Sequence, residues 1–174
     1  TFVPLADFQI NIGRRSLARY KQSDKSESLK KMSNVREVGV VYDVKKTPSQ
    51  LLHKVVHYFE AEGKKVVAIG FLEEKDLGDL VSSYKEEYFC KKDLNFWKLP
   101  KIAAVSKFIA KDFDYLINLD MVGRNELQAI STYSVSKTRI GKHFEQYPFA
   151  QDFMIKSLSE TSEELFNDIK KYIK

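Results

Sequence analysis

The sequence predicts an α/β protein in which a mostly parallel sheet of five to six strands lies between two layers of helices. Two observations support this fold class. From about residue 36 onward, short apolar runs alternate with amphipathic stretches, which is the pattern of β-α-β units around a parallel sheet. The 174-residue chain is also 43% apolar and 13% aromatic, a composition that suffices for one folded domain and excludes a disordered chain.

The net charge of the chain is concentrated at its N-terminus. The 29 basic and 24 acidic residues give a formal charge of +5. Residues 1–36 contain eight basic and three acidic residues, a surplus of five, and the remaining residues hold 21 of each sign. We therefore expect a basic N-terminal arm over residues 1–36, extended or helical, followed by a single α/β domain over residues 37–174.

The first strand and helix of the domain have the clearest signals. Residues 38–44 (VGVVYDV) form a continuous apolar run, as a strand buried on both faces requires. In the next helix, Thr47 is the expected N-cap, with Pro48 at the first helical position and Gln50 completing a capping box. An apolar stripe follows, and Gly63 supplies the left-handed residue that ends the helix.

The rest of the domain continues the alternation. The last helix is expected to start at Ser159 or Thr161, where Glu164 completes a capping box on Thr161. The other expected elements are a strand at 65–71, a short helix at 76–84, a strand at 87–90, a loop at 91–100, a helix at 102–110, a strand at 115–119, a helix at 125–134, a strand at 138–140 and an optional sixth strand at 152–155. With right-handed crossovers, these elements make a three-layer Rossmann-like sandwich.

Ligands of such sheets bind in the crevice outside the carboxyl ends of the strands, where the strand order reverses. That rule selects the polar residues after the first, second and fourth strands: Tyr42, Asp43, Glu73, Glu74, Asn118 and Asp120. Arg124, after Gly123 and before a helix, adds a candidate for anion binding. Two interpretations stay open. Either Asp43 and Asp120 face each other as a general base, metal ligands or ribose ligands, or each closes a turn or caps a helix. The crevice candidates are Asp43, Asn118, Asp120 and Arg124.

The turn between the first strand and its helix (DVKKTPSQ) contains no glycine. A dinucleotide or phosphate site needs glycine there, because the backbone must approach the phosphate closely. The sequence therefore has neither the Rossmann fingerprint nor a P-loop. We expect no cofactor, and we assign no catalytic residue.

Histidine, cysteine and aromatic residues give weaker signals. His53 and His57 have the spacing of a shared metal site, but no carboxylate ligand accompanies them, so no metal site is expected. Cys90 has no paired histidine and is interpreted as a buried structural thiol. Phe96 and Trp97, in the 91–100 loop, either form a protein interface or plug the end of the core.

The basic arm is the main candidate interaction surface. Arms of this kind contact phosphates of RNA without reading its sequence. As a helix, the arm would instead lie on an anionic membrane, with Phe8, Ile12, Leu17 and Tyr20 along one side. The residues expected to bind an anionic partner are Arg14, Arg15, Arg19, Lys21, Lys30 and Lys31.

Several segments resemble known families. VGVVYDV, KKVVAIGFLEEKDL, YFCKKDLNFWKLPK, FDYLINLDM and SKTRIGKH are similar, in this order and over about residues 36–173, to an uncharacterised family common in the Bacteroidota and catalogued only as a domain of unknown function. That resemblance implies the fold and no activity. FDYLINLDMVGRN and KTRIG also resemble the N-terminal Rossmann-like half of heptosyltransferase-type glycosyltransferases. Those enzymes hold the donor nucleotide mainly on a second domain, so this resemblance implies binding rather than catalysis.

Together these observations favour a non-catalytic binding or adaptor module that docks through its arm on RNA or the ribosome, a membrane surface, or a larger protein complex. Sequence-specific DNA binding is not expected. The alternative is a small enzyme, or a nucleotide- or sugar-nucleotide-binding protein, that uses the crevice at the first and fourth strands. No apolar run approaches 18 residues, so no transmembrane segment is expected. A single cysteine favours a cytoplasmic location, peripheral to the inner membrane or on the ribosome.

Overall fold

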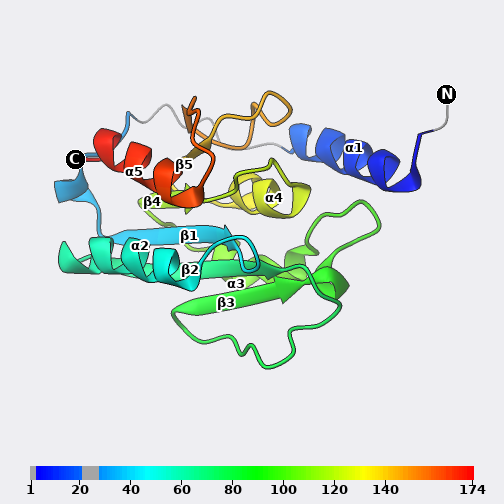
Figure 1. Cartoon of the computed structure of the whole chain (residues 1–174), viewed down its shortest axis with the longest axis horizontal. Coiled ribbons are helices and arrows are strands. Elements are labelled where there is room, and N and C mark those ends of the chain that lie inside the picture. The colour runs from blue at the N-terminus through cyan, green and yellow to red at the C-terminus, as the bar shows by residue number, and fades with distance from the viewer. Residues whose placement is uncertain (1–2, 21–27) are drawn as a thin grey trace.

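The computed structural model describes residues 3–20 and 28–174, which form three layers with a parallel sheet in the middle (Figure 1). The strands are β1 (Glu37–Asp43), β2 (Lys65–Leu72), β3 (Glu86–Cys90), β4 (Tyr115–Asn118), β5 (Thr138–Lys142) and β6 (Phe153–Ile155). The α-helices of the described residues are α1 (Leu5–Ala18), α2 (Ser49–Ala61), α3 (Ile102–Ile109), α4 (Asn125–Tyr133) and α5 (Ser162–Tyr172), and two 3-10 turns, η1 (Met32–Asn34) and η2 (Lys91–Asp93), precede β1 and follow β3. The predicted Rossmann-like α/β sandwich is confirmed.

The order of the strands places a switch point in the middle of the sheet. The order is β3-β2-β1-β4-β5-β6, and every neighbouring pair is parallel. The chain therefore builds from β1 to one edge, returns to the middle, and builds from β4 to the other edge. In the register of β1 and β4, Val41 is paired with Asn118. The carboxyl ends of these two strands are where the fold offers a ligand site.

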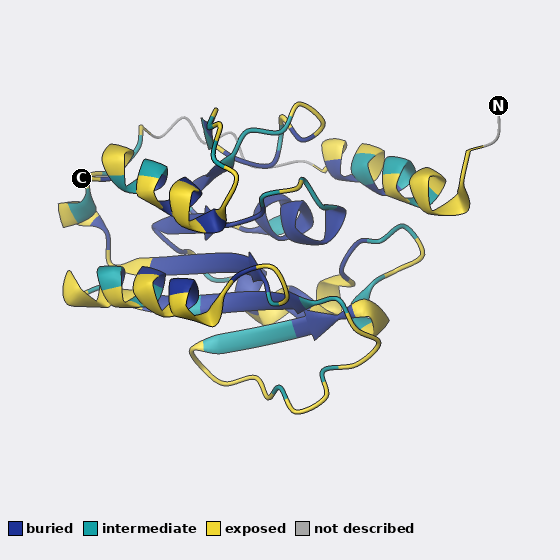
Figure 2. Ribbon diagram, in the orientation of Figure 1, coloured by how far each residue is buried: buried dark blue, intermediate teal, exposed yellow. Residues whose placement is uncertain are grey.

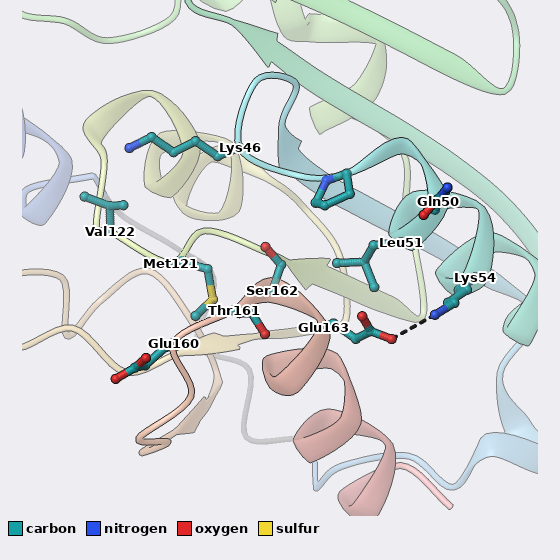
Figure 3. Close-up of a pocket in the computed structure, with 11 residues that line it drawn as sticks. Lys46, Gln50, Leu51, Lys54, Met121, Val122, Glu160, Thr161, Ser162 and Glu163 are labelled. Atoms are coloured by element: carbon teal, nitrogen blue, oxygen red, sulfur yellow. Dashed lines mark hydrogen bonds and ion pairs between the residues drawn. The ribbon is translucent and has the colours of Figure 1, made fainter.

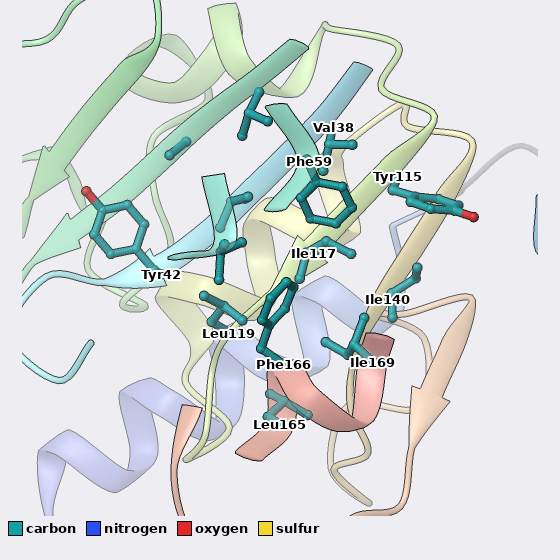
Figure 4. Close-up of a cluster of buried hydrophobic side chains, with 14 of the residues drawn as sticks. Val38, Tyr42, Phe59, Tyr115, Ile117, Leu119, Ile140, Leu165, Phe166 and Ile169 are labelled. Carbon is teal, nitrogen blue, oxygen red and sulfur yellow. The ribbon is translucent and has the colours of Figure 1, made fainter. Parts of the chain in front are cut away.

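Side chains of the central strands alternate between the two helical layers. On one face, Val40 of β1 and Ile117 of β4 belong to the core cluster that includes Phe59 of α2 and residues of α5 (Figure 4). On the other face, Val41 and Leu116 belong to the cluster formed with α3 and α4. Figure 2 shows buried central strands, α2 and α5 exposed along their outer sides, and an almost fully buried α4. The continuous apolar runs of the sequence are thus explained by burial on both faces.

The connection between β2 and β3 differs from the prediction. The expected helix at 76–84 is absent, and residues 73–85 are irregular. Asp76 accepts a hydrogen bond from the backbone N–H of Gly78, and Gly78 has a positive φ of 55°, so Asp76 closes a turn instead of capping a helix. Val81 is 81% exposed and Tyr84 is 76% exposed. A short helix with no buried apolar face is not stable, and the prediction of one was wrong.

The start of α2 also differs in detail. Its N-cap is Pro48 in an extended conformation (φ −58°, ψ 137°), and no side chain caps it, so the expected capping box of Thr47 and Gln50 is wrong. The reason lies in the preceding turn, where the backbone N–H of Thr47 donates to the carbonyl of Asp43 at 2.9 Å and draws Thr47 out of the cap position. The expected end is confirmed, because Gly63 has a positive φ of 75°.

At the start of α5 half of the expected capping box forms. Thr161 is the N-cap, and its hydroxyl accepts a hydrogen bond from the backbone N–H of Glu164 at 3.2 Å. The carboxylate of Glu164 accepts from the N–H of Glu160 at 2.8 Å, one residue before the cap. The other expected strands and helices of the domain end within two residues of their predicted bounds.

Asp114, directly before β4, holds the amino ends of β1 and β4 together. Its carboxylate accepts the backbone N–H groups of Arg36 at 2.8 Å and Glu37 at 3.1 Å, and it pairs with Lys137 at 3.0 Å and Lys30 at 3.4 Å. Burial opposes ionisation of this group. The Arg36 N–H, the Lys137 ammonium and the Glu37 N–H outweigh that effect and lower the pKa of Asp114 to about 2.

We expect Asp114→Asn to lower the free energy of unfolding by about 2 kcal/mol at pH 7, because a carboxyl pKa that falls from 3.8 to about 2 on folding stabilises the folded state above the unfolded pKa. This stabilisation is lost as the pH falls through the folded pKa, so the variant and the parent converge between pH 4 and pH 2. Urea unfolding across that range measures the difference. Asp112→Asn, at an exposed partner of Lys137, is the control and should cost under about 1 kcal/mol. A difference for Asp114→Asn that does not change with pH contradicts the prediction.

Candidate functional site

One arginine joins the carboxyl ends of three neighbouring strands. Arg124, the N-cap of α4, donates from Nη1 to Asp43 at the end of β1 (3.1 Å) and to Glu73 just after β2 (2.9 Å). Its Nη2 donates to Glu126 at 3.4 Å, and the guanidinium lies 5.2 Å from the ring centroid of Phe71. The side chain of Arg124 is 15% exposed and that of Asp43 is 6% exposed. We call the four charged side chains, Arg124, Asp43, Glu73 and Glu126, the Arg124 cluster.

The Arg124 cluster is a structural network of ion pairs, in which one guanidinium is paired with three carboxylates. Burial opposes the charge of Arg124, but the hydrogen bond to Glu73 and the carboxylates of Glu126 and Asp43 outweigh it and raise the pKa of the guanidinium. The same hydrogen bond lowers the pKa of Glu73. A general acid or base needs a pKa near the working pH, whereas Glu73 is held ionised by its partner. Glu73 is therefore not prepared for proton transfer.

Asp43 also occupies the turn that binds phosphate in glycine-rich relatives of this fold. Its Oδ1 accepts the backbone N–H groups of Lys45 at 3.0 Å and Lys46 at 3.2 Å, while Oδ2 accepts from Arg124. In a phosphate-binding loop such N–H groups point at the ligand. Here the chain's own carboxylate takes them, so Asp43 closes the turn between β1 and α2.

Asp120 has the equivalent role at the turn before α4. Its Oδ1 accepts the N–H groups of Val122 at 3.0 Å and Gly123 at 3.1 Å, and its Oδ2 accepts the N–H of Arg124 and the side-chain amide of Gln128, both at 2.8 Å. Asn118 bonds to backbone and side chain of α4, through the carbonyl of Leu127 at 3.0 Å and the hydroxyl of Ser131 at 2.8 Å. Asp43, Asp120 and Asn118, all selected from the sequence, thus lie close together. Their polar side-chain atoms form hydrogen bonds with backbone and side-chain groups of the same chain.

Little space remains at the switch point. The cavity there has a volume of about 20 Å³, room for about one water molecule. Beside it, a cleft of about 480 Å³ lies between the N-terminal ends of α2 and α5, within the range of roughly 300–1,000 Å³ that is usual for small-molecule sites. The cleft is lined by Lys46, Pro48, Gln50, Leu51, Lys54, Met121, Val122, Glu160, Thr161, Ser162 and Glu163 (Figure 3).

The cleft has mixed charge. Lys54 of α2 pairs with Glu163 of α5 at 2.9 Å across it, as the dashed line in Figure 3 shows. The hydrogen bond to Lys54 is the main cause that lowers the pKa of Glu163. Lys46 lines both this cleft and the small cavity at the switch point. Two helix N-termini favour a negative ligand group, whereas Glu160 and Glu163 oppose one.

The predicted basic residues that the structure describes belong to two segments, α1 with its C-cap and the chain before β1, which lie at opposite ends of the sheet (Figure 1). α1 lies beyond the carboxyl ends of the strands and contacts α4, and it presents Arg15 and Arg19 to solvent. Arg14 donates to Asn11 within the same helix at 3.0 Å. Lys30 and Lys31 lie at the amino end of β1, where Lys30 pairs with Asp114 and Lys31 is exposed. Lys21 lies outside the described residues.

The side of α1 that contacts the domain is short and closely packed. Gly13 and Leu17 are its buried residues, and Leu17 belongs to a cluster with Ala129 of α4. A Cβ on Gly13 would lie 2.2 Å from the carbonyl oxygen of Trp97, so only glycine fits there. Tyr20 packs edge-on against Tyr133. Leu17 therefore faces the core, so the prediction that it shares a membrane-facing side with Phe8, Ile12 and Tyr20 was wrong.

The aromatic loop before α3 both supports α1 and adds to the surface. The ring of Trp97 lies 4.8 Å from that of Phe96 and 6.1 Å from that of Phe8 in α1. The side-chain amide of Gln9 donates to the carbonyl of Phe96 at 2.9 Å. Trp97 is half-buried, whereas Phe96 is 57% exposed. Asn125 of α4 completes the joint by donating to the carbonyls of Ile10 and Trp97. Trp97 packs against the core cluster that contains Leu17, as the core interpretation expects, whereas the exposed Phe96 does not; a protein interface at this loop stays a prediction.

The sequence did not point to Glu126 as a member of the Arg124 cluster, nor to Glu160 and Thr161 as residues that line the cleft. Glu126 follows Arg124 in the first turn of a helix, where an acidic residue is favoured by the helix dipole whatever else it contacts. Glu160 and Thr161 line the cleft only because β5 and β6 carry α5 back beside α2. Within residues 3–20 and 28–174, no helix is long and apolar enough to cross a membrane, and no three histidine, cysteine or acidic side chains gather as metal ligands would.

Comparison with known proteins identifies a family and nothing more. A family model described as a family of unknown function (DUF6913) matches residues 10–174. No curated protein and no solved structure matches the chain. The family match carries no source organism and no glycosyltransferase likeness, so those two parts of the sequence interpretation stay predictions.

We expect Arg124→Met to lower the free energy of unfolding by about 3 kcal/mol, because it leaves the nearly buried carboxylate of Asp43 without its counter-ion. Lys54→Met is the control, because it breaks an exposed pair with Glu163 and should cost less than about 1 kcal/mol. Adding Asp43→Asn to Arg124→Met should recover part of the loss. Urea unfolding at pH 7 measures all three, and an equal, small loss for Arg124→Met and Lys54→Met contradicts a structural role for the cluster.

Proposed function

This chain belongs to a family of unknown function (DUF6913), and we propose that it is a non-catalytic α/β binding or adaptor module that docks through its basic N-terminal arm on an anionic partner. The candidate partners are RNA or the ribosome, a membrane surface, and a larger protein complex. A cytoplasmic location, peripheral to the inner membrane or on the ribosome, is part of the same proposal.

The observation that carries the proposal is the exposure of Arg15 and Arg19 on α1. In the part of the chain that the structure describes, neither arginine lies within ion-pair distance of a carboxylate. Both lie at the C-terminal end of α1, where the helix dipole favours a positive charge. One arginine would satisfy the dipole, so the dipole does not explain why two arginines are exposed there. Unpaired arginines on a rigidly held helix are suited to bind phosphate groups.

The filled crevice supports the non-catalytic part of the proposal. The N–H groups that bind a phosphate in related folds are taken by Asp43 and Asp120, and Arg124 is engaged by three carboxylates. A ligand at the switch point would have to displace all of these contacts. Binding at the outer surface of α1 requires no such rearrangement.

The proposal predicts that Arg15→Gln with Arg19→Gln weakens binding to anionic probes by about tenfold or more at low salt, since each arginine near a charged surface contributes about 1 kcal/mol. Binding of the 174-residue chain is measured with a single-stranded RNA homopolymer and with phosphatidylglycerol vesicles across a salt series. Lys107→Gln with Lys156→Gln removes the same charge from exposed positions elsewhere and is the matched control. Equal losses in both double variants, or no binding to either probe, contradict the proposal.

A second candidate function is supported by the 480 Å³ cleft between α2 and α5. It lies beside the switch point, where nucleotides bind in folds of this topology, and Lys46 is available at its edge. The candidate is a nucleotide- or sugar-nucleotide-binding protein or small enzyme. The resemblance of residues 113–125 to a glycosyltransferase half, proposed from the sequence alone, suggests the same kind of ligand.

This second candidate predicts saturable thermal stabilisation by a nucleotide or nucleotide sugar, because a ligand that binds only the folded state raises its stability as its concentration exceeds Kd. Lys46→Gln should weaken the effect, and Lys64→Gln, beyond the other end of α2, should not. Differential scanning fluorimetry with a panel of nucleotides and nucleotide sugars measures the shift. A flat response over the panel contradicts ligand binding in the cleft.

A further inference from the structure

The outward side of α1 combines apolar and basic residues at helical spacing. Positions 5, 8, 12, 15 and 19 follow one another at intervals of three and four, so they lie on one side of the helix. Leu5 is 62% exposed, Phe8 is 47% exposed and Ile12 is half-buried. Arg15 and Arg19 continue the same side toward the C-terminal end of the helix. Gly13 and Leu17 occupy the opposite side and are buried.

A second element widens the apolar part of this side. Phe96, 57% exposed, stacks edge-on against Trp97, and Trp97 contacts Phe8, so Trp97 joins aromatic rings from two segments. Val3, 57% exposed, precedes the helix at the same end. We call this surface the α1–Trp97 face, made up of Leu5, Phe8, Ile12, Phe96 and Trp97 with Arg15 and Arg19.

We propose that the α1–Trp97 face docks on an anionic lipid bilayer. The apolar residues enter the boundary between headgroups and acyl chains, and Arg15 and Arg19 contact the lipid phosphates. This inference rests on the proposed function and names its partner. α1 has 14 residues and does not span a membrane, so it lies in the plane of the interface.

The composition of the face favours lipid over the other anionic partners. RNA binds to aromatic rings by stacking and to cations through its phosphates, but it offers nothing to exposed aliphatic side chains such as Leu5 and Val3. Acyl chains accept both kinds of apolar group, and aromatic residues are favoured at the membrane interface. The two arginines supply the complementary charge for anionic lipid.

The joint between α1 and the domain fixes how the molecule would sit on the bilayer. Gly13 contacts the backbone of Trp97, and Asn125 bonds to the carbonyls of Ile10 and Trp97, so helix and loop present their rings together. The face lies at the carboxyl end of the sheet, beyond α4 (Figure 1). No further folding is needed for it to meet a surface, which lowers the entropic cost of docking.

The test uses the 174-residue chain and its single tryptophan as an internal probe. Vesicles of equal parts phosphatidylcholine and phosphatidylglycerol are compared with vesicles of phosphatidylcholine alone, by co-sedimentation and by Trp97 fluorescence. We expect binding to the mixed vesicles only, a blue shift of the emission, and quenching by lipids brominated on the acyl chain. Phe8→Ser with Phe96→Ser should reduce binding by about tenfold or more. Val81→Ser with Tyr84→Ser, at two still more exposed positions of the 73–85 loop, is the matched control and should bind as the parent does.

The other outcomes overturn the inference. Binding to RNA with no binding to vesicles removes the lipid partner and leaves the proposed function standing, whereas binding to neither removes both. Vesicle binding that is lost with Arg15→Gln and Arg19→Gln but kept with Phe8→Ser and Phe96→Ser, without quenching, shows adsorption by charge alone. A concentration-dependent dimer that shifts Trp97 without lipid assigns the face to a second copy. Phe96→Ser alone, in an exposed loop position, and circular dichroism of each variant separate loss of binding from loss of fold.

Discussion

The ion pair between Arg124 and Asp43 is the interaction on which the middle of the molecule depends. β1 and β4 are adjacent but come from distant parts of the chain, and their carboxyl ends bring a guanidinium to a nearly buried carboxylate. Glu73 and Glu126 complete the cluster from the end of β2 and from α4. A charge this poorly solvated requires its partners, so the strand ends are held together at the point where related folds leave a crevice.

The first residues at the start of α4 bind two different parts of the molecule, the crevice on one side and α1 on the other. Arg124 and Asn125 are adjacent in the chain, yet Arg124 faces the crevice and Asn125 binds the backbone of α1 and of the Trp97 loop. The hydroxyl of Tyr147 donates to Asn125 at 2.5 Å and fixes its orientation. The start of α4 thus fills the crevice with Arg124 and holds α1 in place with Asn125. The outward side of α1 and the cleft between α2 and α5 stay accessible.

The sequence predicted the sheet well because burial on both faces of a parallel strand leaves a continuous apolar run, as in residues 38–44. It also selected Asp43, Asn118, Asp120 and Arg124 correctly as neighbours, since the carboxyl ends of parallel strands share one edge. It failed at residues 76–84, where amphipathic spacing without a surface to bury makes no helix. It failed at Leu17 because apolar spacing in a helix does not say which side meets the rest of the chain.

The sequence by itself therefore determined the α/β class, the basic N-terminal segment and the absence of a glycine-rich phosphate loop, because each of these depends on residue types in local order. Only the tertiary structure decided that the crevice carboxylates bind the chain's own N–H groups and Arg124. The tertiary structure also decided that Lys30 and Arg15 lie at opposite ends of the sheet, and that the rings of Phe8 and Phe96 both contact Trp97. Those outcomes depend on contacts between residues tens of positions apart, and local order carries no information about which distant groups the strand order will bring together.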